Sequence, residues 1–170
     1  ENDNNELLDK IKLKLDAYTN ELSFIEKKYI NYKNKNLKIL SIIAFRKGDL
    51  NLSLNFLNTI EEKQGFNCWD YEFKGDVLFR MKKYEEAIRS FENSIKECKS
   101  GLIYFSLGRA YFAKGNISKN KSQLFYAKAS KNFLKSLTLE KDLLEVRQFY
   151  ARSLAKQGKM AEAYLQDAEI

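Results

Sequence analysis

The sequence predicts an all-α protein built as a solenoid of antiparallel helix pairs. Three observations carry this: a residue pattern that occurs twice, glycine-containing turns that recur with it, and a heptad stripe near the N-terminus. The pattern comprises Tyr71, Gly75, Leu78, Tyr84, Ala87, Phe91 and Ser94, and then Tyr104, Gly108, Tyr111, Tyr126, Ala129, Phe133 and Ser136. Its period of about 34 residues, with small residues at fixed positions, is typical of stacked helix pairs.

The N-terminal segment, residues 1–33, does not fit the repeat. Its apolar residues are spaced alternately by three and four positions: Leu8, Ile11, Leu15, Tyr18, Leu22, Ile25 and Tyr29. This is a heptad stripe over residues 4–32. It fits one long helix packed on the first repeat, a coiled-coil seam to a partner or a second copy, or two shorter helices broken near Thr19. We favour packing on the first repeat, because the ends of a solenoid must be covered.

Four repeats are expected between residues 34 and 170. The central two, 68–100 and 101–143, carry the full pattern. In the outer two, 34–67 and 144–170, Ser41 and Ala151 replace the glycine. The last repeat is short, since its second helix would run only from about Met160 to the end of the chain.

Within each repeat, the two helices are expected to approach closely at the glycine and the alanine. A larger side chain there would force them apart, and overpacking costs about 1–3 kcal/mol. Glycine also ends the first helix in three of the four predicted turns, as a residue with positive φ would: Gly48, Gly115 and Gly158. The third repeat has an insertion at 116–125. We expect its polar part, residues 116–121, to be exposed at the helix turn, with the second helix resuming near Ser122.

From about Asn34 to the end, this pattern resembles the tetratricopeptide repeat (TPR) family. The resemblance implies a right-handed α-solenoid, capped by a long N-terminal helix or a helical hairpin. It also implies a concave groove, lined by the first helix of each repeat, that holds a partner protein. The chain departs from the family pattern at Lys74, where leucine is usual, and in having no proline.

The groove positions of the family map here onto aromatic residues and arginines. The partner-binding residues implied are Phe45, Arg46, Trp69, Phe79, Arg80, Phe105, Arg109, Phe112 and Arg152. Aromatic and arginine side chains dominate binding hot spots, although the phenylalanines could instead pack between repeats. The Lys and Asn pair with which some members clamp a C-terminal carboxylate is not reproduced, because Lys38 is followed by Ile42. A helical or extended partner segment with apolar and acidic residues fits better.

No feature of the sequence indicates catalysis, a cofactor or a metal. The chain has no histidine, which removes the commonest acid-base group and metal ligand. Asp70, Glu72 and Asp76 are close in sequence, and we interpret them as a solvated acidic face. The expected function is a non-catalytic protein-interaction scaffold. The alternatives are an oligomerisation module that uses residues 4–32, or an accessory domain of a larger enzyme or membrane-anchored protein.

The net charge of +7 favours acidic partners. The lysines are scattered, so we expect no nucleic-acid binding, and no apolar run approaches the ~18 residues needed to cross a bilayer. Because the chain begins with Glu rather than Met, we expect a processed or cut form. A soluble domain is expected, cytoplasmic, or periplasmic or in the cell envelope if a signal or anchor lies upstream.

The two cysteines, Cys68 and Cys98, lie at opposite ends of one predicted helix pair. Because antiparallel helices bring these ends together, a disulfide is geometrically possible. We favour two free, partly buried thiols.

Overall fold

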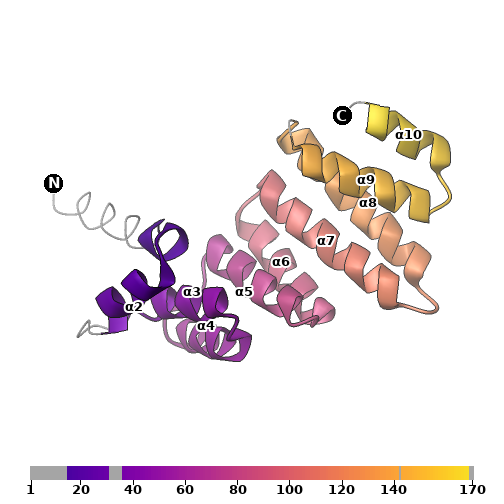
Figure 1. The fold of residues 1–170 in the computed structure, drawn as a ribbon. Coiled ribbons are helices and arrows are strands. Elements are labelled where there is room, and N and C mark those ends of the chain that lie inside the picture. The colour runs from indigo at the N-terminus through magenta and orange to yellow at the C-terminus, as the bar shows by residue number, and fades with distance from the viewer. Residues whose placement is uncertain (1–14, 31–35, 142, 169–170) are drawn as a thin grey trace. The chain divides into compact units, whose positions relative to one another are not determined.

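The computed structural model describes residues 15–30, 36–141 and 143–168. In these ranges every regular element is an α-helix, which confirms the predicted fold class (Figure 1). The helices are α2 (Leu22–Ile30), α3 (Leu37–Lys47), α4 (Leu50–Gln64), α5 (Cys68–Arg80), α6 (Tyr84–Glu97), α7 (Gly101–Ile117), α8 (Ser122–Leu139), α9 (Leu144–Lys156) and α10 (Met160–Ala168). None of these helices is both long and apolar enough to cross a membrane. The chain divides into two compact units, Glu1–Phe66 and Asn67–Ile170.

The first unit is built on the antiparallel pair α3 and α4. The turn between them passes through Gly48, whose φ of 83° suits a residue without a side chain. The two helices approach closely at Ser41 and Ser53, both fully buried. The Ser53 hydroxyl donates a 2.8 Å hydrogen bond to the Ser41 carbonyl, so serine replaces glycine here with its own polar group satisfied.

The N-terminal segment is two helices rather than one. Residues 15–19 are helical, the helix ends at Asn20, and α2 begins at Leu22. Arg46 of α3 holds this break, because its guanidinium donates to the carbonyl oxygens of Ala17 at 2.6 Å and Asn20 at 2.7 Å. These carbonyls lie at a helix end, where intrahelical partners run out.

The break divides the heptad stripe. Ile25 is fully buried and α2 contacts α3, as expected of a cap. Leu15 and Tyr18, however, are 60% and 48% exposed. The prediction of a stripe packed along its length on the first repeat is therefore wrong for these two residues. Leu8 and Ile11 lie outside the described residues, as does the side chain of Tyr29.

The second unit stacks three helix pairs, α5/α6, α7/α8 and α9/α10. The first helices are neighbours, since α7 contacts both α5 and α9. The glycine-alanine pattern marks the close contacts, as predicted. A Cβ at Gly108 would lie 2.5 Å from the ring of Phe133, and a Cβ at Gly75 would collide with Phe91 in the same way. Both alanines of the pattern are fully buried.

One prediction about the turns is wrong. Gly115 does not end α7, which continues to Ile117. Gly115 is instead buried against α8, where an added Cβ would lie 2.7 Å from the ring of Tyr126. The inserted residues mainly lengthen the two helices, so that only 118–121 connect them; α8 does begin at Ser122, as expected.

Replacing Gly108 by leucine should lower the free energy of unfolding by about 2 kcal/mol or more. The reason is that a side chain there must displace the fully buried ring of Phe133. Urea unfolding followed by circular dichroism measures the change. Ala127→Leu, at an exposed position on α8, is the matched control and should change stability little. Equal midpoints for Gly108→Leu and the parent protein would contradict the close contact.

Candidate partner-binding face

The predicted site residues fall in both units. Phe45 and Arg46 lie on α3 in the first unit. Phe45 is half-buried, and Arg46 is engaged with the N-terminal helix end. The other seven lie on three neighbouring helices of the second unit, and we call their surface the α5–α7–α9 face: Trp69, Phe79, Arg80, Phe105, Arg109, Phe112 and Arg152.

Arg109 joins two of these helices. Its guanidinium lies 4.9 Å from the ring centre of Phe79 on α5 and 5.5 Å from that of Phe105 on its own helix. Such cation–π contacts contribute roughly 0.5–2 kcal/mol, depending on solvation. Arg109 therefore orients Phe79 within the face, and its own charge is partly satisfied inside the protein.

Phe105 belongs to the core rather than the surface. It is 8% exposed, and its ring centre is 6.0 Å from Phe133 and 5.6 Å from Phe149. Phe112 lies at the edge of the same cluster, 5.9 Å from Phe149, and stays half-buried. For Phe105, packing between repeats was the correct interpretation.

Sequence reasoning missed Phe149. Its ring touches Phe105, Phe112 and Phe133, and it also lies 5.6 Å beneath the Arg152 guanidinium. The groove positions transferred from the family did not include this residue. Its place two residues before Ala151, on the first helix of the last repeat, was the available signal.

The most exposed apolar groups of the face lie at its N-terminal edge. Trp69 is 48% exposed and Leu102 is 49% exposed, and each stands six positions before the glycine of its repeat. Leu102 was not among the residues singled out from the sequence. Arg80 and Arg152 are exposed at other points of the face, so a partner would meet apolar groups and positive charges.

Glu72 and Asp76 do not form a solvated acidic face, and that interpretation is wrong. Both are half-buried. Burial, and then the negative charge of Asp76, raise the pKa of Glu72 to about 7, while a hydrogen bond from Ser106 and the charge of Arg109 oppose the shift. Burial also raises the pKa of Asp76 against the effects of Arg109 and Arg80.

Asp70 has a separate, structural role. It is buried, and its carboxylate accepts a 3.2 Å hydrogen bond from the backbone of Asn67, whose side chain accepts from the Trp69 and Asp70 amides in return. This reciprocal capping box fixes the first turn of α5. Among the described residues, no three histidine, cysteine or acidic side chains are grouped closely enough to hold a metal ion.

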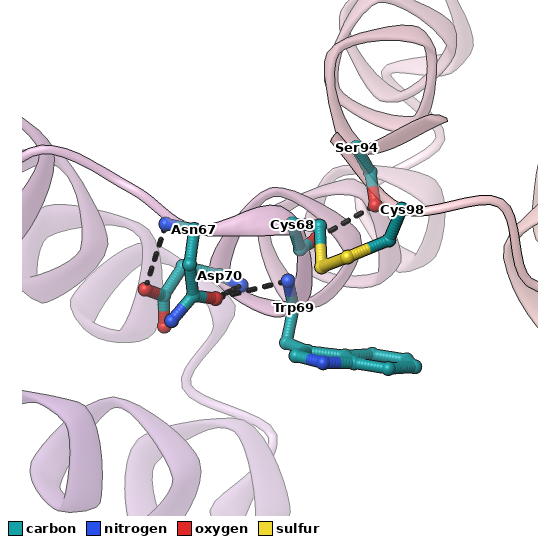
Figure 2. Close-up of a disulfide and its surroundings, with 6 residues drawn as sticks. All are labelled: Asn67, Cys68, Trp69, Asp70, Ser94 and Cys98. Atoms are coloured by element: carbon teal, nitrogen blue, oxygen red, sulfur yellow. Dashed lines mark hydrogen bonds between the residues drawn. A yellow bond between two sulfur atoms is a disulfide. The ribbon is translucent and has the colours of Figure 1, made fainter. Parts of the chain in front are cut away.

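Cys68 and Cys98 are joined by a disulfide, so the preference for free thiols is wrong (Figure 2). Their Cα atoms are 5.8 Å apart, within the usual range for a bridge. The bond connects the first residue of α5 to the residue that ends α6. Trp69 follows Cys68 directly on that first turn.

Comparisons with known proteins establish the fold. No family model matches the sequence, and no curated protein matches it either. The structure is similar to solved structures of MamA proteins. The MamA structure designated AMB-1 is 16% identical, with a TM-score of 0.76 over 93% of this chain and 92% of that one. MamA from Desulfovibrio magneticus RS-1 is 15% identical, with a TM-score of 0.71 over 87% and 78%.

A further MamA crystal structure is 17% identical, with a TM-score of 0.70 over 86% of this chain and 75% of that one. At such identities the likeness concerns the fold. Together with the helix pairs described above, it supports a TPR-like α-solenoid.

Replacing Glu72 by glutamine should stabilise the protein at high pH. The folded state holds a proton on Glu72 that the unfolded state releases between pH 4.5 and about 7, so stability falls as pH rises through that window. Near pH 8 the variant should unfold with a free energy about 1–3 kcal/mol higher than the parent, and near pH 4 the two should agree.

Urea titrations at the two pH values test this. Glu85→Gln is the control, because Glu85 is fully exposed and its ion pair with Lys114 lowers its pKa. A difference between Glu72→Gln and the parent that is the same at both pH values would contradict the raised pKa.

Proposed function

We propose that this protein is a non-catalytic interaction scaffold whose α5–α7–α9 face holds a partner polypeptide. The observation that carries the proposal is that exposed Trp69 and Leu102 lie on the same two helices as half-buried Phe79 and Phe112, and that these helices contact each other. Stacked helix pairs present extended surfaces of this kind, and partner binding is their usual use.

The aromatic residues of the face are suited to be anchors because they are already oriented. Phe79 is held between Tyr84, at 5.5 Å, and Arg109. Phe112 is held between Tyr126, at 5.5 Å, and Phe149. Side chains that keep one orientation lose little entropy on binding. The partner would therefore find a surface that is largely formed beforehand.

The charges of the face favour a partner segment with acidic residues. Arg152 is exposed with its guanidinium over Phe149, and Lys156 is exposed one helical turn further along α9. Arg109 is less available, because it lies over two rings and faces Glu72 and Asp76. We therefore assign steering of an acidic partner to α9 and apolar anchoring to α5 and α7.

Self-association is the second candidate function, and one observation favours it. Leu15 and Tyr18 of the heptad stripe are exposed although their helix is anchored by Arg46. Exposed apolar positions with heptad spacing are suited to pair with a second copy.

Replacing Trp69 or Phe79 by alanine should weaken partner binding about thirtyfold, since the loss of an aromatic anchor costs about 2 kcal/mol. A partner captured with the parent protein would be titrated calorimetrically against each variant after circular dichroism has shown that the variants fold. Leu124→Ala is the control, because Leu124 is equally exposed but lies on α8. Parent-like affinity in both face variants would contradict the use of this face.

Replacing Leu15 by glutamate separates the second candidate from the first. If the stripe pairs with another copy, the parent protein should dimerise or form larger species in sedimentation equilibrium, and Leu15→Glu should remain monomeric. Leu124→Glu serves as the control for a charge placed on another exposed leucine. A parent protein that is monomeric throughout the accessible concentration range would remove this candidate.

A further inference from the structure

The second and third repeats close their helix pairs at the same place by different chemistry. In each, a serine of the second helix donates to the carbonyl of the first residue of the first helix. Ser94 donates to Cys68 at 2.6 Å, and Ser136 donates to Gly101 at 2.8 Å. In each, the residue four positions after that serine ends the second helix, and its amide donates back to the serine carbonyl.

Those helix-ending residues are Cys98 and Glu140, and each reaches back to the start of its helix pair. Cys98 forms the disulfide with Cys68. Glu140 accepts a 3.0 Å hydrogen bond from the Gly101 amide, and its carboxylate occupies the space that a side chain at position 101 would need. A covalent bond in one repeat thus takes the place of a carboxylate cap in the next.

The covalent closure lies beside the exposed edge of the candidate face. Trp69 follows Cys68 on the first turn of α5 (Figure 2). The second compact unit begins at this turn. The capping box of Asn67 and Asp70 satisfies the amides of this turn, but both of its members lie on the same short segment. This turn is tied to α6 by the disulfide and by two hydrogen bonds, from Ser94 to the Cys68 carbonyl and from Ser90 to the Tyr71 carbonyl at 2.8 Å. The disulfide is the covalent one of these three ties.

We propose that the Cys68–Cys98 disulfide is a redox-controlled clamp on the Trp69 edge of the α5–α7–α9 face, which keeps that edge ordered for partner binding in an oxidising compartment. The inference rests on the proposed function, since it concerns the regulation of the same face. Disulfides persist in oxidising compartments and are rare where small thiols keep cysteines reduced. The clamp therefore confines full partner binding by the face to oxidising compartments.

The releasing reaction uses a small-molecule thiol as the reductant. Its thiolate attacks the sulfur of Cys98, which is the less buried of the two residues, and the disulfide breaks to leave a Cys68 thiolate and a mixed disulfide. A second thiolate attacks the mixed disulfide and releases Cys98. Two electrons pass to the protein sulfurs, two protons are taken up, and the small thiols leave as their own disulfide.

The clamp has a direct test in hydrogen exchange of the parent protein, oxidised and after reduction. The amides from Trp69 to Lys74 should exchange roughly tenfold faster or more in the reduced form, since the bond closes a loop with a sequence separation of 30. The amides from Leu102 to Leu107 on α7 are the internal control and should not change. Equal exchange in both forms, or equal acceleration at both helices, would overturn the proposal.

Trp69 provides a second readout, because it is the only tryptophan in the chain. Quenching of its fluorescence by acrylamide should increase on reduction, and an unchanged quenching constant would count against release of the edge.

A variant that gives the second repeat the carboxylate closure of the third tests whether the position of the closure matters or its covalent chemistry. Cys68→Gly combined with Cys98→Glu copies the arrangement of the third repeat. It should keep slow exchange at the first turn of α5 with or without reductant, whereas Cys98→Ala should exchange as fast as the reduced parent. If the double variant is slow and Cys98→Ala is equally slow, no closure is needed and the proposal fails.

Binding distinguishes the failure of this inference from the failure of the proposed function. A partner that binds the oxidised parent through Trp69 should bind the reduced parent at least tenfold more weakly. Equal affinity in the two forms would reject the clamp and leave the scaffold function intact. If the oxidised protein shows no binding that depends on Trp69, the proposed scaffold function of this face is rejected. The exchange experiment would still decide on the clamp.

The compartment is tested in the producing cells. Free thiols are trapped with an alkylating reagent at lysis, and mass spectrometry then shows whether Cys68 and Cys98 are bonded. The bonded pair is expected, and two alkylated cysteines would overturn the assignment to an oxidising compartment.

Discussion

The packing of the second unit depends on the contact between a glycine of one helix and a phenylalanine of the next. At Gly75 and Gly108 the helix backbone approaches the rings of Phe91 and Phe133 so closely that no side chain fits between them. Because this contact fixes the distance and rotation within the α5/α6 and α7/α8 pairs, it also decides which side of α5 and α7 faces outward. Trp69 and Leu102 are exposed for this reason, although both are strongly apolar. The candidate face is therefore a consequence of how the core is packed.

The parts of the fold that follow from local rules could be predicted from the sequence. The glycines recur after 33 residues (75 to 108), and the alanines after 42 (87 to 129) because of the insertion, so the helix pairs and the start of α8 were predictable. Gly115 was misassigned because a glycine that ends a helix and a glycine that admits a ring look the same in sequence. The exposure of Leu15 was missed because it depends on the break at Asn20 and on Arg46, which is distant in sequence.

The candidate site was predicted less completely than the fold, because its properties arise from contacts between helices. The family positions located Trp69, Phe79 and Arg109 correctly on neighbouring helices. They did not show that Phe105 belongs to the core, which depends on Phe149 of the next repeat. The burial of Glu72 likewise depends on α7, which contributes Ser106 and Arg109. The sequence of one helix is enough to identify the candidate residues. Their exposure and charge state depend on contacts with the neighbouring helix.

The turn after α5 shows that paired helices of this fold can be joined by the same turn without a glycine. Three of the turns between paired helices share one hydrogen-bond pattern, in which two successive amides return to carbonyls three and five residues earlier. Glycine takes the left-handed position in two of them, and Lys82 takes it in the third with a φ of 61°. A side chain there costs about 1–2 kcal/mol. The second repeat could therefore be made more resistant to heat by one substitution at Lys82, an exposed position. Such a change would touch neither the core nor the candidate face.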